Sequence, residues 1–379
     1  MQFIFTILSA LVVAATAKNA TFYKVEEAIK DHYIVVMEPG YEAEVITKLL
    51  MEDNSGTFSN VSIKHTYKTA IKGFSAKLTD KALQKLLARE EIKYITQDGM
   101  AHAMAVASWG LDRIDQRELP LLGDYDVRGD GSGVNVYVID TGIYPESLYF
   151  GGRATPVFDS IEDGRPFGID CNGHGTHCAG TVGASLYGVA QNVKLFGLRT
   201  LDCGGSGSWS GIVSACDYVA QNGNSPALAS MSLGGGANTA VDDAVRGMIA
   251  SGVTTVVAAG NSAANACGYS PARVSEAITV GATDINDEEA SFSNYGTCVD
   301  VYGPGVDIPS AWIGGTEETK TISGTSMATP HVTGAIALRL AKRPNLTPAS
   351  IKQRVIKKST KNVITNIGSG SPNRLLYAP

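Results

Sequence analysis

The sequence is short of positive charge, of long apolar runs and of internal repeats. It contains 31 Lys and Arg residues and 37 Asp and Glu residues, so the net charge is −6, and no basic cluster is present in the sequence. This argues against a nucleic-acid partner, because a polyanion is held by a concentrated positive surface. Beyond the N-terminus, no apolar segment has the roughly 20 residues that a membrane-spanning helix needs. The 379 residues, 44% of them hydrophobic, suffice for more than one domain around a large core.

Common enzyme motifs are also missing. No HExxH pattern accompanies His174 and His177, and we set aside the alternative that this pair is half of a metal site. The Gly-x-Ser-x-Gly elbow is absent around Ser326, which argues against an α/β-hydrolase. The glycine-rich segment 129–133 precedes a predicted strand, whereas a dinucleotide-binding loop follows one.

The first 17 residues have the composition of a signal peptide. They are apolar, contain no acidic residue and end in Ala15-Thr16-Ala17, a small-residue cleavage pattern. We therefore expect a soluble protein that is secreted to the extracellular space. Export permits disulfide bonds, and all six cysteines lie at position 171 or later. The sequence alone allows fifteen complete pairings of six cysteines.

Residues 18–102 differ in composition from the rest of the chain. They contain eleven lysines, four glycines and no cysteine. The predicted elements follow the order βαββαβ, which is typical of a ferredoxin-like α+β sandwich. The predicted strands are 32–37, 61–67, 70–78 and 91–98, and the predicted helices are 41–53 and 79–90.

From residue 103 onwards, predicted strands alternate with predicted helices. This alternation is typical of an α/β fold in which helices cover both faces of a parallel sheet. A final helix begins at Thr347-Pro348, a capping residue followed by proline at the first helical position. The predicted strands are 134–139, 193–198, 229–233, 254–259 and 277–282, with helices at 211–221 and 239–251 among those between them.

Three polar residues in this second region suit nucleophilic catalysis. Ser326 lies in the segment GTSMATPH, between a glycine-threonine turn and a stretch with helix-forming character. A serine needs a histidine base and a carboxylate that orients the base. His174 lies between two glycines, and Asp140 ends a buried strand, where functional groups of α/β sheets gather. The chain order Asp, His, Ser is one of the orders in which such triads occur.

The segments VIDTG (138–142), NGHGTH (172–177) and GTSMATPH (324–331) resemble the three signature blocks of the subtilisin-like serine proteases, or subtilases. The resemblance spans residues 109–378, and the segments 109–116, 291–296 and 368–377 make it most similar to the proteinase K and aqualysin branch. It implies a serine endopeptidase with a subtilisin-like fold. Ser326 would attack the peptide carbonyl, His174 would carry the proton, Asp140 would orient His174, and Asn261 would stabilise the oxyanion.

The resemblance also assigns the residues that bind substrate. Two walls of a primary specificity pocket are implied, and neither contains a charged residue, so we expect a broad preference for large apolar or aromatic side chains before the cut. Residues 202–209 are expected to form a further edge strand for the peptide. The first wall is Ser232, Leu233, Gly234 and Gly235, and the second is Ala258, Ala259 and Gly260.

The resemblance further implies cysteine pairing and metal binding. Cys171–Cys203 and Cys267–Cys298 would be disulfide bonds, which leaves Cys178 and Cys216 as free thiols. We considered Cys178 as a nucleophile and rejected it, because a position one helical turn beyond His174 suits packing. Catalysis needs no cofactor, but a structural calcium ion is implied at Asp300 with the carbonyl oxygens of Ser275 and Ala277. A second, weaker match to a calcium loop is Asp112, Asp115, Gln116 and Asp124.

Residues 18–102 resemble the inhibitory propeptide of this family, including the segment Gly73–Ala76. We expect a self-processing zymogen that cuts itself near His102, with residues 103–379 as the catalytic domain. The alternative is an N-terminal domain that is retained. The expected partners are protein and peptide substrates and the chain's own propeptide, with no nucleic acid and no membrane, and we expect a monomer. Two rival functions are a secreted serine esterase and an inactive binding protein; the predicted peptide-binding walls argue against the first and the intact triad against the second.

Overall fold

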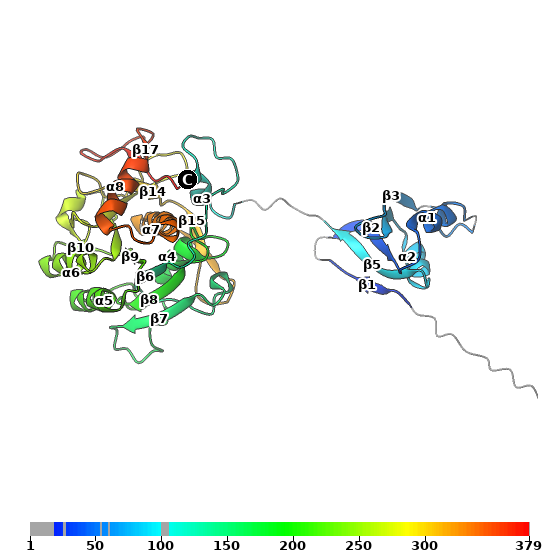
Figure 1. Cartoon of the computed structure of the whole chain (residues 1–379), viewed down its shortest axis with the longest axis horizontal. Coiled ribbons are helices and arrows are strands. Elements are labelled where there is room, and N and C mark those ends of the chain that lie inside the picture. The colour runs from blue at the N-terminus through cyan, green and yellow to red at the C-terminus, as the bar shows by residue number, and fades with distance from the viewer. Residues whose placement is uncertain (1–18, 26–27, 54, 60, 100–105, 379) are drawn as a thin grey trace, which may run out of the picture. The chain divides into compact units, whose positions relative to one another are not determined.

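The computed structural model describes residues 19–25, 28–53, 55–59, 61–99 and 106–378. The chain divides into two compact units, Met1–Met104 and Ala105–Pro379, which Figure 1 shows in blue to cyan and in blue-green to red. The predicted signal peptide at 1–17 and the predicted cut near His102 lie outside the described residues. Within the described ranges, no helix has both the length and the apolar character that crossing a membrane requires.

The N-terminal unit is a five-stranded sheet with two helices (Figure 1). The strand order β1-β5-β2-β4-β3 contains the predicted ferredoxin-like arrangement and adds one strand, β1, which the sequence did not predict; it pairs in parallel with β5. The elements are β1 (Thr21–Tyr23), β2 (Ala28–Met37), α1 (Ala43–Met51), β3 (Ser62–Tyr67), β4 (Gly73–Lys77), α2 (Asp80–Leu87) and β5 (Ile92–Gly99).

This unit has its own core between the helices and the sheet. Val35, Phe74 and Ile95 from three neighbouring strands are completely buried, as is Leu86 of α2. Helix α2 begins where the side chain of Thr79 accepts a hydrogen bond from the backbone N–H of Ala82, at 3.2 Å. Such a cap satisfies an N–H group that has no partner inside the helix.

The C-terminal unit is built on a nine-stranded sheet in the order β17-β18-β14-β13-β11-β9-β6-β8-β7. Neighbouring strands are parallel except for the antiparallel pair β17 and β18, so the sheet is mixed and not purely parallel as the sequence predicted. The strands are β6 (Asn135–Asp140), β7 (Ala154–Asp159), β8 (Lys194–Arg199), β9 (Ala227–Met231), β11 (Thr254–Ala258), β13 (Ile278–Thr283), β14 (Val301–Pro304), β17 (Thr360–Lys361) and β18 (Arg374–Leu375).

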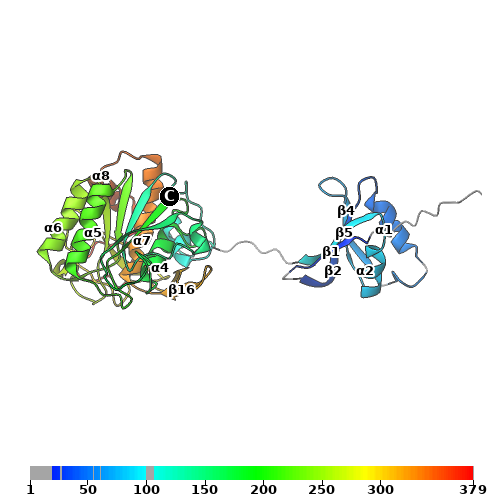
Figure 2. The ribbon, with the colours of Figure 1, turned by 90° about the horizontal axis from the view of Figure 1, so that it is seen from below.

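Helices cover both faces of this sheet (Figures 1 and 2). Successive residues of a strand point to opposite faces, so β6 feeds two separate cores. Val136 and Val138 pack in the core that contains α4 (His174–Gly183) and α7 (Thr325–Lys342). Tyr137 and Ile139 pack in the core that contains α5 (Trp209–Asn222) and α6 (Thr239–Ala250), the two helices that lie side by side in Figure 2.

Shorter elements complete the unit. Helix α8 (Pro348–Lys358) begins as predicted, with the Thr347 side chain accepting a hydrogen bond from the Ser350 backbone and proline in the first turn. The others are α3 (Trp109–Asp115), η1 (Leu148–Phe150), β10 (Gly235–Gly236), η2 (Ala266–Gly268), β12 (Tyr269–Ser270), β15 (Ile308–Ala311) and β16 (Thr319–Ile322).

Candidate active site

Asp140 ends strand β6 at the place where the chain order of the sheet reverses, between β8 on one side and β9 on the other. Ligands of open α/β sheets bind at such a point. The Asp140 side chain is completely buried. Its Oδ1 accepts hydrogen bonds from the backbone N–H of Thr141 at 2.7 Å and from Nδ1 of His174 at 2.8 Å. The carboxylate therefore fixes the imidazole with Nδ1 as the protonated nitrogen.

His174 is the first residue of α4 and follows a tightly constrained glycine. Gly173 has a φ of 103°, and a Cβ atom there would lie 2.4 Å from the ring of Trp312. Glycine is therefore required at this position. Burial disfavours the imidazolium form of His174, but the Asp140 carboxylate outweighs that effect and holds the pKa of His174 well above its ordinary value of 6.5.

A buried carboxylate that the sequence did not single out, Asp170, ties these two segments together. Its Oδ1 accepts from the Thr141 hydroxyl at 2.9 Å and from the backbone of Asn172 and Gly173. Its Oδ2 accepts from the backbone and the hydroxyl of Thr176 in the first turn of α4. Asp170 thus caps the helix that carries His174 and also holds the residue after Asp140. Four of its five donors lie within six residues in the sequence, and only the Thr141 hydroxyl comes from a distant segment.

Ser326 is the second residue of α7 and is 9% exposed. Its hydroxyl donates to the carbonyl oxygen of Ser232 at 3.1 Å, and the Ser232 hydroxyl donates back to the Ser326 carbonyl at 2.8 Å. Among the described residues, this carbonyl and not His174 accepts the Ser326 hydroxyl. Ser326 and His174 nevertheless line the same cavity. The structure therefore joins His174 to Asp140 and leaves Ser326 in a second hydrogen-bonded pair.

Asn261 follows strand β11, and its side-chain orientation is fixed by Thr325. The Asn261 Oδ1 accepts from the backbone N–H and from the hydroxyl of Thr325, at 2.8 and 2.9 Å. The carbonyl end of the amide is thereby occupied, and the Nδ2 donors have no partner among the described residues. Asn261 borders the same cavity as Ser326. This arrangement offers hydrogen-bond donors next to a serine hydroxyl, which suits a developing negative charge.

The cavity beside Ser326 has a volume of about 530 Å³. All seven residues predicted to form the two walls line it. Among the residues that the structure describes, the ionisable side chains in the lining are those of His174 and Tyr269 alone. Residues 202–209 reach the cavity through Gly205 to Gly207 and Trp209, and their pairing with an extended peptide stays a prediction. Asp202 accepts the backbone N–H groups of Gly204 and Ser206, so this segment begins with a turn. A second cavity of about 560 Å³, between α7 and α8, is lined by Asp115 of the weaker calcium match but by none of the predicted catalytic or substrate-binding residues.

The second histidine of the NGHGTH segment has a structural position. The His177 ring is completely buried, its Nε2 donates to the carbonyl oxygens of Ile308 and Lys320, and burial lowers its pKa to about 4. Its Nε2 is thus bound to the backbone, and among the described residues the possible metal ligands grouped with His174 are Asp140 and Cys178, not His177. Cys178 lies with its Sγ 3.9 Å from Nδ1 of His174, but it is buried and burial raises the pKa of its thiol. Cys178 and Cys216 are the free cysteines, both buried, as expected.

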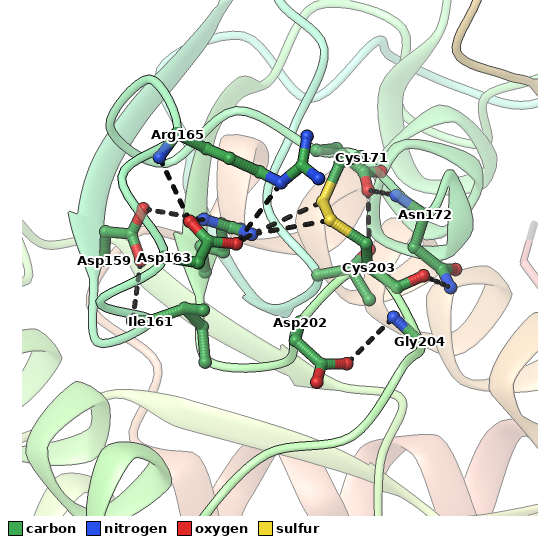
Figure 3. A network of polar contacts seen from close by, with 12 residues as sticks. Asp159, Ile161, Asp163, Arg165, Cys171, Asn172, Asp202, Cys203 and Gly204 are labelled. Carbon is green, nitrogen blue, oxygen red and sulfur yellow. Dashed lines mark hydrogen bonds and ion pairs between the residues drawn. A yellow bond between two sulfur atoms is a disulfide. The ribbon is translucent and has the colours of Figure 1, made fainter.

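Both disulfide bonds that the resemblance implies are present. Cys171–Cys203 closes a separation of 32 residues and Cys267–Cys298 one of 31. Figure 3 shows the Cys171–Cys203 disulfide bond, with Asp163 and Asn172 nearby. The side-chain amide of Asn172 donates to the Cys203 carbonyl at 2.9 Å, so the bond and this contact both fasten the segment that precedes His174. Closing a loop of this length contributes about 3 to 4 kcal/mol in the chain-entropy model.

The implied calcium site at Asp300 does not fit a metal ion in this structure. The ammonium group of Lys352 lies 2.8 Å from the Ser275 carbonyl oxygen, 2.7 Å from the Ala277 carbonyl oxygen and 2.7 Å from Oδ2 of Asp300. All three expected oxygen ligands thus accept hydrogen bonds from one lysine. The prediction of calcium at these residues is wrong for this structure, because a cationic side chain already occupies the point at which the oxygens converge.

Comparison with known proteins places this geometry in a family. Residues 131–375 match the model of the Subtilase family, and residues 32–104 match that of Peptidase inhibitor I9. The chain is 48% identical over 348 residues to "Extracellular serine proteinase" of Thermus sp. (strain Rt41A), covering 91% of this chain and 83% of that protein. It is 42% identical over 360 residues to "Proteinase R" of Parengyodontium album, and the match covers 93% of this chain and 89% of that protein.

A solved structure agrees with these relatives. The "crystal structure of a cold adapted subtilisin-like serine proteinase" superposes with a TM-score of 0.70 at 51% identity, covering 73% of this chain and 99% of the other. The predicted subtilisin-like fold is thereby confirmed. The chain belongs to the subtilase family of serine endopeptidases, and in residues 32–104 it contains the inhibitor unit of a zymogen.

Proposed function

We propose that Asp140, His174 and Ser326 form the catalytic triad of this endopeptidase. The observation that carries the proposal is the 2.8 Å hydrogen bond from His174 to the buried Asp140, at the rim of the cavity that Ser326 also lines. With Nδ1 protonated and held by Asp140, Nε2 is the nitrogen free to accept the serine proton. Subtilases need no cofactor for this reaction.

The reaction begins when the Ser326 hydroxyl turns from the Ser232 carbonyl to Nε2 of His174. Catalytic hydrogen bonds are often formed only in the complex with substrate, so the free arrangement is a resting one. Ser326 Oγ then attacks the peptide carbonyl carbon while its proton passes to His174. The proton is next delivered to the leaving amine, and water attacks the acyl-enzyme by the same route to release the acid and restore the serine.

The negative charge on the carbonyl oxygen is stabilised by two groups. The first is Nδ2 of Asn261, which is free because Thr325 occupies the other end of the amide. The second is the backbone N–H of Ser326 at the start of α7, since the first N–H groups of a helix have no acceptor within it. Both donors are fixed before the substrate arrives, and such preorganised donors give electrostatic stabilisation without reorganisation.

We further propose a preference for large apolar or aromatic side chains before the cut. The walls predicted to hold that side chain consist of small and apolar residues, so a buried charge would find no partner there. The test compares kcat/KM for peptide series that differ only in this residue. Phenylalanine, tyrosine and leucine should exceed aspartate and lysine by at least about 100-fold, or about 3 kcal/mol. Equal rates for lysine and phenylalanine would contradict the preference, whereas ester cleavage without peptide cleavage would favour the rival serine esterase, which uses the same triad.

Maturation is proposed to follow the domain boundaries that the sequence predicts. Residues 1–17 direct secretion, residues 18–102 inhibit the enzyme until they are cut off near His102, and residues 103–379 act as a monomeric protease. The extracellular relatives and the inhibitor family match support this order of events. N-terminal sequencing of the secreted protein tests it, because a mature protein that still began near Lys18 would show that the N-terminal unit is retained.

The second calcium match of the resemblance is the loop with Asp112, Asp115, Gln116 and Asp124. Asp112 accepts the backbone N–H groups of Leu122 and Gly123, which closes the loop around its carboxylate. Burial raises the pKa of Asp115, and the neighbouring carboxylates raise it further, so a cation would relieve their repulsion. We propose that any calcium stabilising the native chain lies in this loop. A melting temperature that is the same in calcium and in chelator would contradict this assignment.

A further inference from the structure

Lys352 of α8 contacts the segments that precede two strands of the sheet. Its ammonium group meets the carbonyl oxygens of Ser275 and Ala277, which precede β13, and the carboxylate of Asp300, which precedes β14. The Lys352 and Asp300 side chains are only 19% and 15% exposed. An ammonium group has three N–H donors, and here each donor has one acceptor, so the hydrogen-bonding capacity of the group is fully used.

The three oxygen atoms converge on one point, and this arrangement suits a metal cation as well as an ammonium group. Two are carbonyl oxygens and one is a carboxylate oxygen, the hard donors that calcium also prefers. Asp300 Oδ2 is itself held in place by the backbone N–H of Thr279 at 3.0 Å. The guanidinium of Arg374 lies 3.4 Å from the Asp300 carbonyl oxygen and adds positive charge nearby. A divalent ion together with the ammonium would therefore place excess positive charge beside a single carboxylate.

From this geometry we propose that Lys352 is a tethered substitute for a bound metal ion. Its ammonium closes the junction of α8, β13 and β14 in place of calcium, so this junction does not depend on metal. Removing the ammonium leaves the three oxygens converging on an open point and creates a calcium site that the native chain lacks.

The junction also adjoins the proposed specificity cavity. Residues 269–277 run from strand β12 to the two carbonyl groups that Lys352 binds, and Tyr269, Ser270 and Ala272 line that cavity. Lys352 therefore fastens the far end of a segment whose near end faces substrate. A metal ion in this place can be lost by chelation or dilution, whereas a side chain cannot.

The test uses the full chain with Ser326→Ala, which prevents self-digestion, and compares it with the same chain carrying Lys352→Met in addition. Methionine keeps much of the side-chain volume but removes the charge and the donors. Lys357→Met is the matched control, because Lys357 is an exposed lysine on the same helix. Melting temperatures are measured in chelator and in calcium chloride, and calorimetric titration with calcium chloride counts the ions bound per chain.

In chelator, Lys352→Met should melt several degrees below both the parent and Lys357→Met. Calcium should recover most of that loss, and the titration should find one more ion per chain than in the parent. Adding Asp300→Asn to Lys352→Met should abolish the extra ion. Comparison with the parent separates this ion from any calcium bound by the loop near Asp115.

Three results would overturn the proposal. An unchanged number of ions in Lys352→Met would show that the oxygens cannot bind calcium, and the loss of an ion from the parent on Asp300→Asn alone would show that the native site already holds one. A melting temperature of Lys352→Met equal to that of Lys357→Met would show that the ammonium fastens nothing. If Lys352→Met does not fold in either condition, Lys352→Gln, which is uncharged but keeps two donors, is measured against the same expectations.

Discussion

The substitution Asp170→Asn tests whether the geometry of His174 depends on a residue that does not touch substrate. Asparagine has nearly the same shape as aspartate but presents one acceptor oxygen and an NH₂ group. If its oxygen keeps the three donors at Thr141, Asn172 and Gly173, its NH₂ group must face the backbone N–H of Thr176. The helix that begins at His174 then loses its cap and a stabilising negative charge.

The size of the effect follows from the bonds that are lost. The hydrogen bond from the Thr176 backbone to a charged acceptor contributes about 1.5 to 3 kcal/mol, and its buried N–H is left facing another donor, whereas the Thr176 hydroxyl can turn and accept from the NH₂ group. Because these contributions are not additive, we expect a loss of about 3 to 5 kcal/mol in the free energy of unfolding, or roughly 10 °C in Tm. A displacement of His174 by about 1 Å costs on the order of 100-fold in rate, so kcat should fall by about 10- to 100-fold. KM should change little, since Asp170 does not line the cavity.

The assay measures kcat and KM at a temperature well below both melting points, after active-site titration to count the competent molecules. Asp217→Asn is the control: it makes the same chemical change at an exposed aspartate of α5 whose partner is Gln221. A variant that melts lower but has the native kcat would refute the positioning of His174 by Asp170. A variant with native Tm and native kcat would refute the energetic argument as well.

Two further predictions concern the chemistry directly. Asn261→Ala should lower kcat by about 100- to 1000-fold with little change in KM, a magnitude taken from the corresponding donor of subtilisin; a loss of less than about tenfold would show that this amide does not meet the oxyanion. The value of kcat/KM should rise with pH as His174 loses its proton. Because Asp140 holds the pKa of His174 above 6.5, kcat/KM should reach half of its maximum at a pH above that value. Maximal cleavage near about pH 4 would contradict a histidine base.

The parts of the molecule that the sequence predicted well are those with local causes. Asp140 ends a strand of β-branched residues, and Ser326 lies at the start of a helix. His174 follows Gly173, whose left-handed backbone conformation favours glycine. Each of the three therefore lies in a short segment that the sequence makes recognisable. The two cores also follow from strand periodicity, because Val136 and Tyr137 are neighbours that face opposite sides of the sheet. What these segments could not show is the present partner of the Ser326 hydroxyl.

The features that the sequence missed depend on contacts between distant segments. Lys352 is 52 residues from Asp300 and lies on a helix whose pattern gives it no special place, so a calcium site was predicted where an ammonium group lies. Asp170 has four donors within six residues, and only its bond to the distant Thr141 hydroxyl shows that it also holds the segment after Asp140. The turn at the start of segment 202–209 has a local cause, since Asp202 with two glycines after Cys203 is a turn signal, and pairing of this segment with a peptide stays a prediction.

The most direct test asks whether Ser326 is the nucleophile that His174 activates. The secreted protein is treated with a fluorophosphonate probe, the labelled residue is located by peptide mass spectrometry, and casein digestion is followed in parallel. The account predicts a single label on Ser326, and loss of both the label and the digestion in Ser326→Ala and in His174→Ala. Casein digestion that continues in Ser326→Ala, or a label on another residue, would contradict it.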